Sequence, residues 1–110
     1  MIGFDDFLKV DMRVGRILAV DEFPEARKPA WKLTIDFGEE LGTRRSSAQI
    51  VHYPAAALRG RLVVGVVNLE PRRIGRSFSS EVLVLGALDP DLGVVLLAPD
   101  ADAAPGSRIG

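Results

Sequence analysis

Residues 31–37 read Trp31-Lys32-Leu33-Thr34-Ile35-Asp36-Phe37, and this stretch decides the fold. Apolar and polar residues alternate along it, a period of two that is typical of a β-strand with one buried face. Trp31 and Phe37 keep the inward phase, so we expect both in the core. Residues 38–43 include two glycines and predict a turn. Alternation resumes over residues 44–50, so the two alternating segments predict an antiparallel hairpin.

The segment before this hairpin predicts another strand. Apolar residues alternate with polar ones from Val10 to Val14, and Gly15 interrupts the pattern. The apolar run at residues 17–20 no longer keeps the same phase, which predicts a bulge or sharp bend of the kind that closes small barrels. The prolines and alternating charges of residues 21–29 indicate a loop.

The second half of the chain predicts one helix and further strands. Residues 53–58 are rich in alanine and predict a short helix. The apolar runs at residues 62–69 and 81–87 predict two buried strands, joined by a loop over residues 71–79. Residues 94–98 form one more apolar run and predict an extra C-terminal strand.

This order of elements predicts an all-β fold, a five-stranded Greek-key barrel with a short helix between strands 3 and 4. With 110 residues the chain has the size of one domain, so we expect a single domain over residues 1–110. Its barrel core is predicted at about residues 8–87, and residues 88–110 form a C-terminal extension. The first residues have helical spacing of apolar side chains and predict one amphipathic turn before the barrel.

Composition excludes several classes of protein. Hydrophobic residues make up 47% of the chain, too many for intrinsic disorder, and the absence of cysteine leaves neither a disulfide nor a thiolate metal site. The first ten residues include Asp5, Asp6 and Lys9 and lack the uninterrupted apolar run of a signal peptide or membrane helix. We therefore expect a cytoplasmic protein with no membrane insertion.

The formal net charge of -1 hides an uneven distribution. From Asp89 onward there are four acidic residues and one basic residue, Arg108, which leaves 13 basic and 11 acidic side chains before Asp89. A surplus of about two positive charges can form a local basic face, and such a face permits nucleic-acid binding.

Six stretches carry a resemblance to a known family, and together they span nearly the whole chain. They are Val10-Asp11-Met12-Arg13-Val14-Gly15-Arg16-Ile17, Phe23-Pro24-Glu25-Ala26-Arg27-Lys28-Pro29, Lys32-Leu33-Thr34-Ile35-Asp36-Phe37-Gly38, Ser46-Ser47-Ala48-Gln49-Ile50, Val67-Asn68-Leu69-Glu70-Pro71-Arg72-Arg73-Ile74 and Ser80-Glu81-Val82-Leu83-Val84-Leu85-Gly86. In order and spacing they resemble the CsaA-type export-related chaperones, and more broadly the tRNA-binding domains appended to several aminoacyl-tRNA synthetases. The Ala-Arg-Lys-Pro and Ser-Ser-Ala-Gln-Ile stretches favour the CsaA type.

The resemblance implies an oligonucleotide-binding fold, a homodimer, tRNA as a partner and a molecular-chaperone role in protein export. Synthetase-type domains often have Ser-Glu-Gly-Met where this chain has Ser80-Glu81-Val82-Leu83. Val82 is β-branched and lacks the backbone freedom of glycine, so only the serine and the glutamate carry over. We expect Glu81 to order an arginine, because a carboxylate repels phosphate.

Three arginines mark the candidate RNA-binding loop. Arg72, Arg73 and Arg76 lie in the predicted loop between strands 4 and 5, which borders the ligand face of an OB-fold barrel. The alternative is a solvated turn.

Polar residues of the strand at residues 44–50 either contact RNA or simply face solvent, and Asn68 either completes a local turn or contacts the ligand. The predicted RNA-binding set is Arg44, Arg45, Ser47, Gln49, Asn68, Arg72, Arg73, Arg76 and Ser80.

Apolar residues outside the barrel strands predict two other contacts. Phe78 lies in the same predicted loop, where its ring can stack on a base or on an apolar peptide residue. The C-terminal apolar run has to be buried, either against the chain's own barrel or against a second copy. We expect a homodimer, with the N-terminal turn contributing to the contact. The predicted dimer interface is Phe4, Phe7, Leu8, Val94, Val95, Leu96 and Leu97.

The sequence offers no catalytic constellation. His52 is the only histidine, and without cysteine or paired carboxylates no metal site is predicted. Nucleophile and nucleotide-binding glycine motifs are missing. We therefore predict a non-catalytic tRNA-binding protein that uses no cofactor. The alternative is a chaperone-like binder of unfolded or precursor polypeptides for which RNA is not the physiological ligand.

Overall fold

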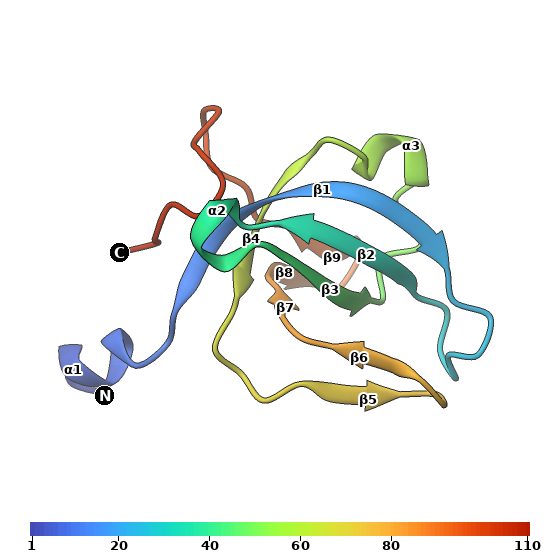
Figure 1. Cartoon of the computed structure of the whole chain (residues 1–110), viewed down its shortest axis with the longest axis horizontal. Helices are drawn as coiled ribbons and strands as arrows, with labels where there is room; N and C mark the ends of the chain where they lie inside the picture. Colours follow the sequence, from blue (N-terminus) through green and yellow to red (C-terminus); the bar gives the residue numbers. More distant parts are fainter.

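The computed structural model describes all residues 1–110. Its centre is a five-stranded antiparallel sheet of order β3-β2-β1-β4-β7 that curls into a nearly closed barrel (Figure 1). The sheet consists of β1 (Met12–Glu22), β2 (Trp31–Asp36), β3 (Thr43–Ala48), β4 (Leu62–Val66) and β7 (Leu83–Val84). Two hairpins accompany it: β5 (Arg72–Ile74) with β6 (Phe78–Ser80), and β8 (Gly86–Asp89) with β9 (Gly93–Leu96). The short helices are α1 (Phe4–Leu8), α2 (Gly38–Leu41) and α3 (Ala55–Leu58).

The alternating segment at residues 31–37 forms the predicted strand. Leu33, Ile35 and Phe37 are fully buried, because every second side chain of β2 points into the barrel. Trp31 is only half-buried; it packs against the core, and its ring nitrogen Nε1 donates a hydrogen bond to the carbonyl oxygen of Tyr53 at 3.0 Å. β2 pairs with β3 from Trp31 to Asp36, so the predicted hairpin is confirmed. The turn between them contains α2, a single helical turn.

The predicted irregularity after Gly15 is also confirmed. The register between β1 and β2 shifts between Ile17 and Ala19, so Leu18 is an extra residue in β1. Such a bulge bends a strand and increases its twist, which lets one long strand pair with β2 at one end and β4 at the other. Gly15 leaves no room for a side chain, since a Cβ atom there would stand 2.6 Å from Cγ2 of Ile35.

The barrel closes between β3 and the segment that joins β6 to β7. The Glu81 backbone N–H donates to the Arg45 carbonyl oxygen at 2.8 Å, and the buried Ser46 hydroxyl donates to the Val82 carbonyl oxygen at 2.9 Å. These bonds replace a regular ladder at the seam. The hydrogen bonds at the seam join the two ends of the main sheet, so its strands follow one another around the barrel in the order β1-β2-β3-β7-β4. This is the arrangement of a five-stranded OB fold, and the predicted fold class is confirmed.

The segment predicted as a loop at residues 71–79 is a second hairpin instead. β5 and β6 pair antiparallel from Arg72 opposite Ser80 to Ile74 opposite Phe78. Gly75 permits the turn, because its φ of +67° suits a residue without a Cβ. The segment from Arg72 to Ile74 is short and contains only one apolar residue. It shows no clear alternation, so the sequence gives no sign that it pairs with β6.

The predicted fifth strand at residues 81–87 is divided. Its first part is β7, which continues the barrel, and its second part opens β8, which pairs with β9 outside the main sheet. Leu96 of β9 turns back into the barrel and belongs to the main core cluster. The core therefore extends beyond the predicted limit at residue 87.

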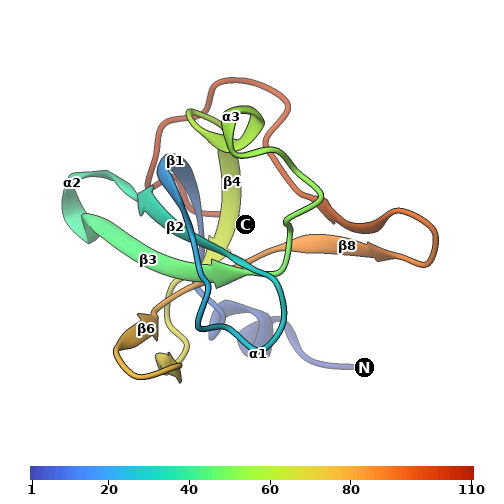
Figure 2. The same ribbon diagram turned by 90° about the vertical axis from the view of Figure 1, so that its right-hand side faces the viewer.

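Figure 2 shows the β8–β9 hairpin projecting from the barrel on the side away from α2. The last residues of the chain return to the barrel, where backbone hydrogen bonds tie residues 106–109 to Met12 and Val14 at the start of β1. The C-terminal extension thereby covers part of the chain's own sheet. No helix of this fold is long and apolar enough to cross a lipid bilayer.

Candidate nucleic-acid interface

One groove of about 610 Å³ lies between three segments that are far apart in the sequence. The β1–β2 loop supplies one wall, β5 supplies another, and the end of β3 forms the floor between them. We call this feature the cationic groove. Its polar lining consists of Glu25, Arg27, Lys28, Ser47, Gln49, Arg72 and Arg73.

Charge in the cationic groove is strongly positive. Arg27 and Lys28 come from the β1–β2 loop and Arg72 and Arg73 from β5, whereas Glu25 is the one carboxylate among the lining residues. All four cations are exposed, and none of them forms a salt bridge within the chain. Four cations around a groove with a single carboxylate create a positive potential that attracts an anion such as a phosphate chain.

The floor of the groove carries polar side chains in a regular spacing. Ser47 and Gln49 point outward because they alternate with residues of β3 that face the core. Arg45 shares their outward phase, and its guanidinium carbon lies 4.6 Å from the ring centre of Phe78. Hydroxyl, amide and guanidinium groups therefore form one row beside the two cationic walls.

The Phe78 ring is buried, so the expectation that it lies in an open loop is wrong. Only 4% of Phe78 is exposed, and its ring centre lies 5.1 Å from that of Phe23. Arg45 covers the same ring, and Lys32 lies near both rings, with its Nζ atom 4.7 Å from the centre of Phe23. The aromatic pair anchors the β5–β6 hairpin to the barrel, and stacking of a base or peptide on Phe78 has no free ring face to use.

Ser80 and Glu81 accept hydrogen bonds from the main chain of β3, the strand that forms the floor of the groove. The Ser80 hydroxyl is buried and accepts a hydrogen bond from the Ser47 backbone N–H at 3.0 Å. Oε1 of Glu81 accepts one from the Arg45 backbone N–H at 2.9 Å. Glu81 thus contacts the main chain of Arg45, whereas the expected contact with an arginine side chain is not formed, and Ser80 positions the groove floor.

The family comparison fits this geometry. The family model described as "Putative tRNA binding domain" matches residues 12–108. The chain belongs to this family of tRNA-binding domains.

Solved structures extend the similarity over the full length of this tRNA-binding domain. It is 49% identical to the CsaA chaperone protein of Picrophilus torridus, with a TM-score of 0.94 and complete coverage of both chains. The chaperone CsaA of Bacillus anthracis is 46% identical, with a TM-score of 0.91 and coverage of 100% of this chain and 99% of that one. The resemblance to CsaA-type proteins and synthetase-type tRNA-binding domains is confirmed.

Among curated relatives, a methionine–tRNA ligase of Acidithiobacillus ferrooxidans is 48% identical over 109 residues. The match covers 98% of this chain and 16% of the ligase. The tRNA-binding domain described here therefore spans about one sixth of the length of that enzyme.

Arg44 does not join the groove of the tRNA-binding domain. It has the inward phase of β3, opposite Ile35, and its Nε atom donates to the Leu41 carbonyl oxygen at 3.2 Å. Neighbouring residues of a strand point to opposite faces, so Arg44 lies on the other face of β3 from Arg45, Ser47 and Gln49.

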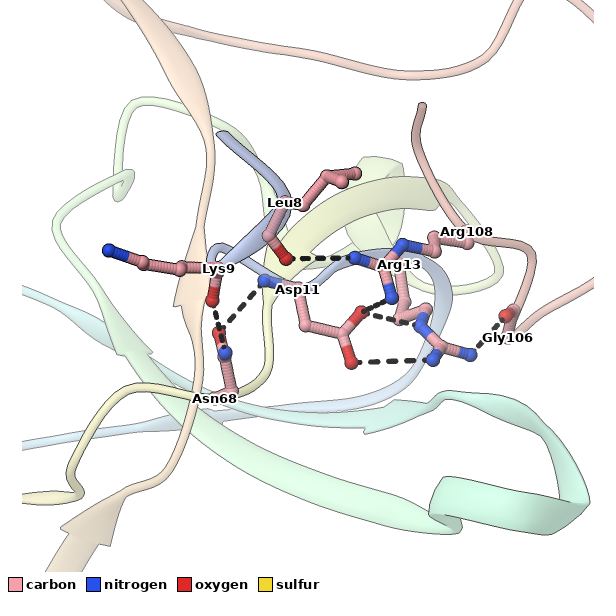
Figure 3. Close-up of polar contacts among 7 residues, drawn as sticks. All are labelled: Leu8, Lys9, Asp11, Arg13, Asn68, Gly106 and Arg108. Atoms are coloured by element: carbon pink, nitrogen blue, oxygen red, sulfur yellow. Dashed lines mark hydrogen bonds and ion pairs between the residues drawn. The ribbon is translucent and has the colours of Figure 1, made fainter. Parts of the chain in front are cut away.

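Asn68 fastens the start of β1 to the end of β4 (Figure 3). Its Nδ2 donates to the Lys9 carbonyl oxygen at 2.7 Å, and its Oδ1 accepts from the Asp11 backbone N–H at 2.9 Å. Both ends of the amide bond to main-chain groups that are remote in sequence, so Asn68 joins two distant segments and completes no local turn. Asn68 is not among the residues that line the cationic groove.

An ion pair continues this junction toward the C-terminus. Nε of Arg13 lies 2.6 Å from Oδ1 of Asp11, Nη1 of Arg13 donates to the Gly106 carbonyl oxygen, and Arg108 donates to the Leu8 carbonyl oxygen (Figure 3). The hydrogen bond from Arg13 holds the pKa of Asp11 below its ordinary value. These arginines stabilise the fold and are not free to bind a ligand.

Arg76 lies in the turn of the β5–β6 hairpin. It lines a separate hollow of about 220 Å³ with Lys32 and Glu25. Glu25 also lines the cationic groove, so Arg76 adds a positive charge next to that groove without entering it.

Sequence reasoning missed two groove residues, Arg27 and Lys28. Two adjacent cations in a loop bounded by Pro24 and Pro29 are the signal in the sequence that could have indicated them. Their partners across the groove come from residues 72 and 73, and that proximity follows from the fold alone.

The predicted dimer residues differ in exposure. Phe4 is 71% exposed, Leu8 and Leu97 are also exposed, and Phe7, Val94 and Val95 are partly buried. Leu96 is buried in the chain's own core, and its backbone N–H donates to the Tyr53 hydroxyl at 3.1 Å. Leu96 is therefore unavailable to a second copy, and here the alternative of packing on the chain's own barrel holds.

Proposed function

We propose that this domain binds tRNA in the cationic groove and does so without chemical change to the RNA. The observation that carries the proposal is the set of four unpaired cations, Arg27, Lys28, Arg72 and Arg73, around one groove of a fold that belongs to a tRNA-binding family. Guanidinium groups suit phosphate oxygens, and two facing walls suit a backbone that passes between them.

The polar floor complements this role. Arg45, Ser47 and Gln49 offer donors and acceptors to a sugar or to the edge of a base, while the walls hold the phosphates. Phosphate contacts carry no sequence information, so recognition depends mainly on the shape of the folded RNA. Such binding fits a cytoplasmic protein.

A homodimer would place two such grooves on one particle. Its support is apolar surface outside the barrel: α1 extends away from the barrel in Figure 1, and Phe4, Leu8 and Leu97 are exposed. Light scattering should give twice the chain mass of 11.9 kDa. A mass of one chain at every concentration would reject the dimer.

A chaperone function is the second candidate. It is favoured by the names of two similar solved structures, both called CsaA chaperones, and by a shallow apolar hollow of about 370 Å³. That hollow lies on the β1–β2 loop and includes Pro24, Pro29, Trp31 and Val51. Unfolded or precursor polypeptides would dock there through apolar contacts, which is also the form that a role in protein export would take.

The deciding experiment measures binding of total tRNA and of one unfolded polypeptide across a salt series. Affinity for tRNA should fall by about 0.7 to 0.9 log units per log unit of salt for each phosphate contact. Polypeptide binding through apolar contacts should change little. A flat salt response for tRNA would refute the role of the cationic groove, and tight polypeptide binding without tRNA binding would favour the chaperone.

A further inference from the structure

Another hollow, of about 270 Å³, adjoins the cationic groove, and Ser47 and Arg72 line both the hollow and the groove. It lies where the β4–β5 connection passes the junction of β6 and β7. Leu69 and Leu83 provide apolar walls and are about half exposed, at 49% and 47%. A hollow of this volume has room for one planar ring system.

The charge of this hollow is opposite to that of the groove. Glu70 and Glu81 line it, with Arg72 as the only cation. Oε1 of Glu81 is fixed by the Arg45 backbone N–H, and no hydrogen bond within the chain uses Oε2. Glu70 takes part in no salt bridge. The hollow therefore offers carboxylate oxygens as free acceptors between apolar walls.

This combination rejects a phosphate and suits the edge of a base. Carboxylates repel phosphate but accept hydrogen bonds from the exocyclic amino groups of cytosine, adenine or guanine. Uracil lacks an amino group: carbonyl oxygens stand on both sides of its one ring N–H donor. Those carbonyl oxygens would face the carboxylates and be repelled by them. Apolar walls such as Leu69 and Leu83 shield the faces of an unstacked ring from water.

We infer that the hollow holds one unpaired base that bears an exocyclic amino group, while Arg72 contacts a phosphate at the mouth of the hollow. The inference rests on the proposed function, because the RNA backbone must lie in the cationic groove for a base to reach the hollow. It adds a preference for base type to binding that otherwise depends on charge and shape.

The test compares oligocytidylate with oligouridylate of about 12 nucleotides, a length within the range one OB fold covers. Both are pyrimidines with the same charge, and they differ in the amino group or carbonyl oxygen at one ring position. Fluorescence anisotropy at neutral pH and fixed salt should show at least about fivefold tighter binding of the cytidine probe.

Two variants locate the preference. Glu70→Ala removes an exposed carboxylate that supports no other residue, and Glu81→Gln keeps an oxygen for the Arg45 backbone. Each should reduce the ratio of the two affinities toward one. Glu25→Ala is the matched control, because it removes the same charge from the groove but not from the hollow, so it should strengthen both probes and leave the ratio unchanged.

Equal binding of the two probes by the unaltered protein would overturn the inference. So would a cytidine preference that survives in both glutamate variants, since the preference would then lie elsewhere. If tRNA still binds with a steep salt response in either case, the proposed function stands. Absence of binding to tRNA and to both probes would overturn the proposed function and the inference together.

Discussion

Removal of two of the four groove cations should halve the salt dependence of tRNA binding. Arg72 and Arg73 are exposed and form no salt bridge, so the double change Arg72→Ala and Arg73→Ala should alter the free energy of unfolding by no more than about 0.5 kcal/mol. If each cation of the groove meets one phosphate, the slope of log affinity against log salt is about -2.8 to -3.6. The double variant should have about half that slope.

These slopes translate into a large difference that filter binding can measure. Between 50 mM and 200 mM salt the unaltered protein should lose about 50- to 150-fold in affinity, and the double variant about 7- to 12-fold. Arg59→Ala is the matched control, since Arg59 is also exposed and follows α3, on the side of the barrel away from β5 (Figures 1 and 2). An unchanged slope in the double variant would show that these arginines do not contact phosphate.

Three further predictions concern the fold. Asn68→Ala removes two hydrogen bonds to the main chain before β1 and should lower the free energy of unfolding by about 1–2 kcal/mol in urea titrations, with tRNA binding retained. Gly15→Ala places a Cβ atom 2.7 Å from Cε1 of Phe37, and overpacking of this kind should cost about 1–3 kcal/mol by the same assay. The Arg13 hydrogen bond lowers the pKa of Asp11 in the folded protein. The ionised Asp11 therefore stabilises the fold at pH values above the Asp11 pKa of the unfolded chain, and this stabilisation is lost as pH falls through the Asp11 pKa of the folded protein. Asp11→Asn should therefore lower the free energy of unfolding at neutral pH, and this free energy should fall less steeply in acid than that of the unaltered protein. An equally steep fall would contradict the role of the Asp11 carboxylate.

Predictions from alternation succeeded where the alternating segment pairs with its neighbour in the chain. The β2–β3 hairpin and the bulge after Gly15 could be read directly, because side-chain direction in a strand depends on local spacing. Arg44 shows the limit of that reasoning. Its inward phase was implied by the same alternation, but its charge led to its assignment to the RNA-binding set with Arg45.

Predictions failed where an environment is built by distant residues. The sequence predicts Phe78 in an exposed loop, because a short polar stretch does not reveal that β5 and β6 pair or that Phe23 covers the ring. The sequence predicts Leu96 at an interface, because five strands complete a barrel before residue 96 is reached. The core had room for one more side chain from β9, and only the packed structure shows this.

The amino-acid sequence by itself determined the all-β barrel, the position of its bend and the family resemblance, because these depend on the order and spacing of residues along the chain. The tertiary structure alone decided which charges meet. Arg27 and Lys28 face β5 across one groove, while Glu70 and Glu81 gather in the hollow beside it. An electrostatic site depends on distances in space, and those are set by strand pairing and barrel closure between segments that are remote in sequence.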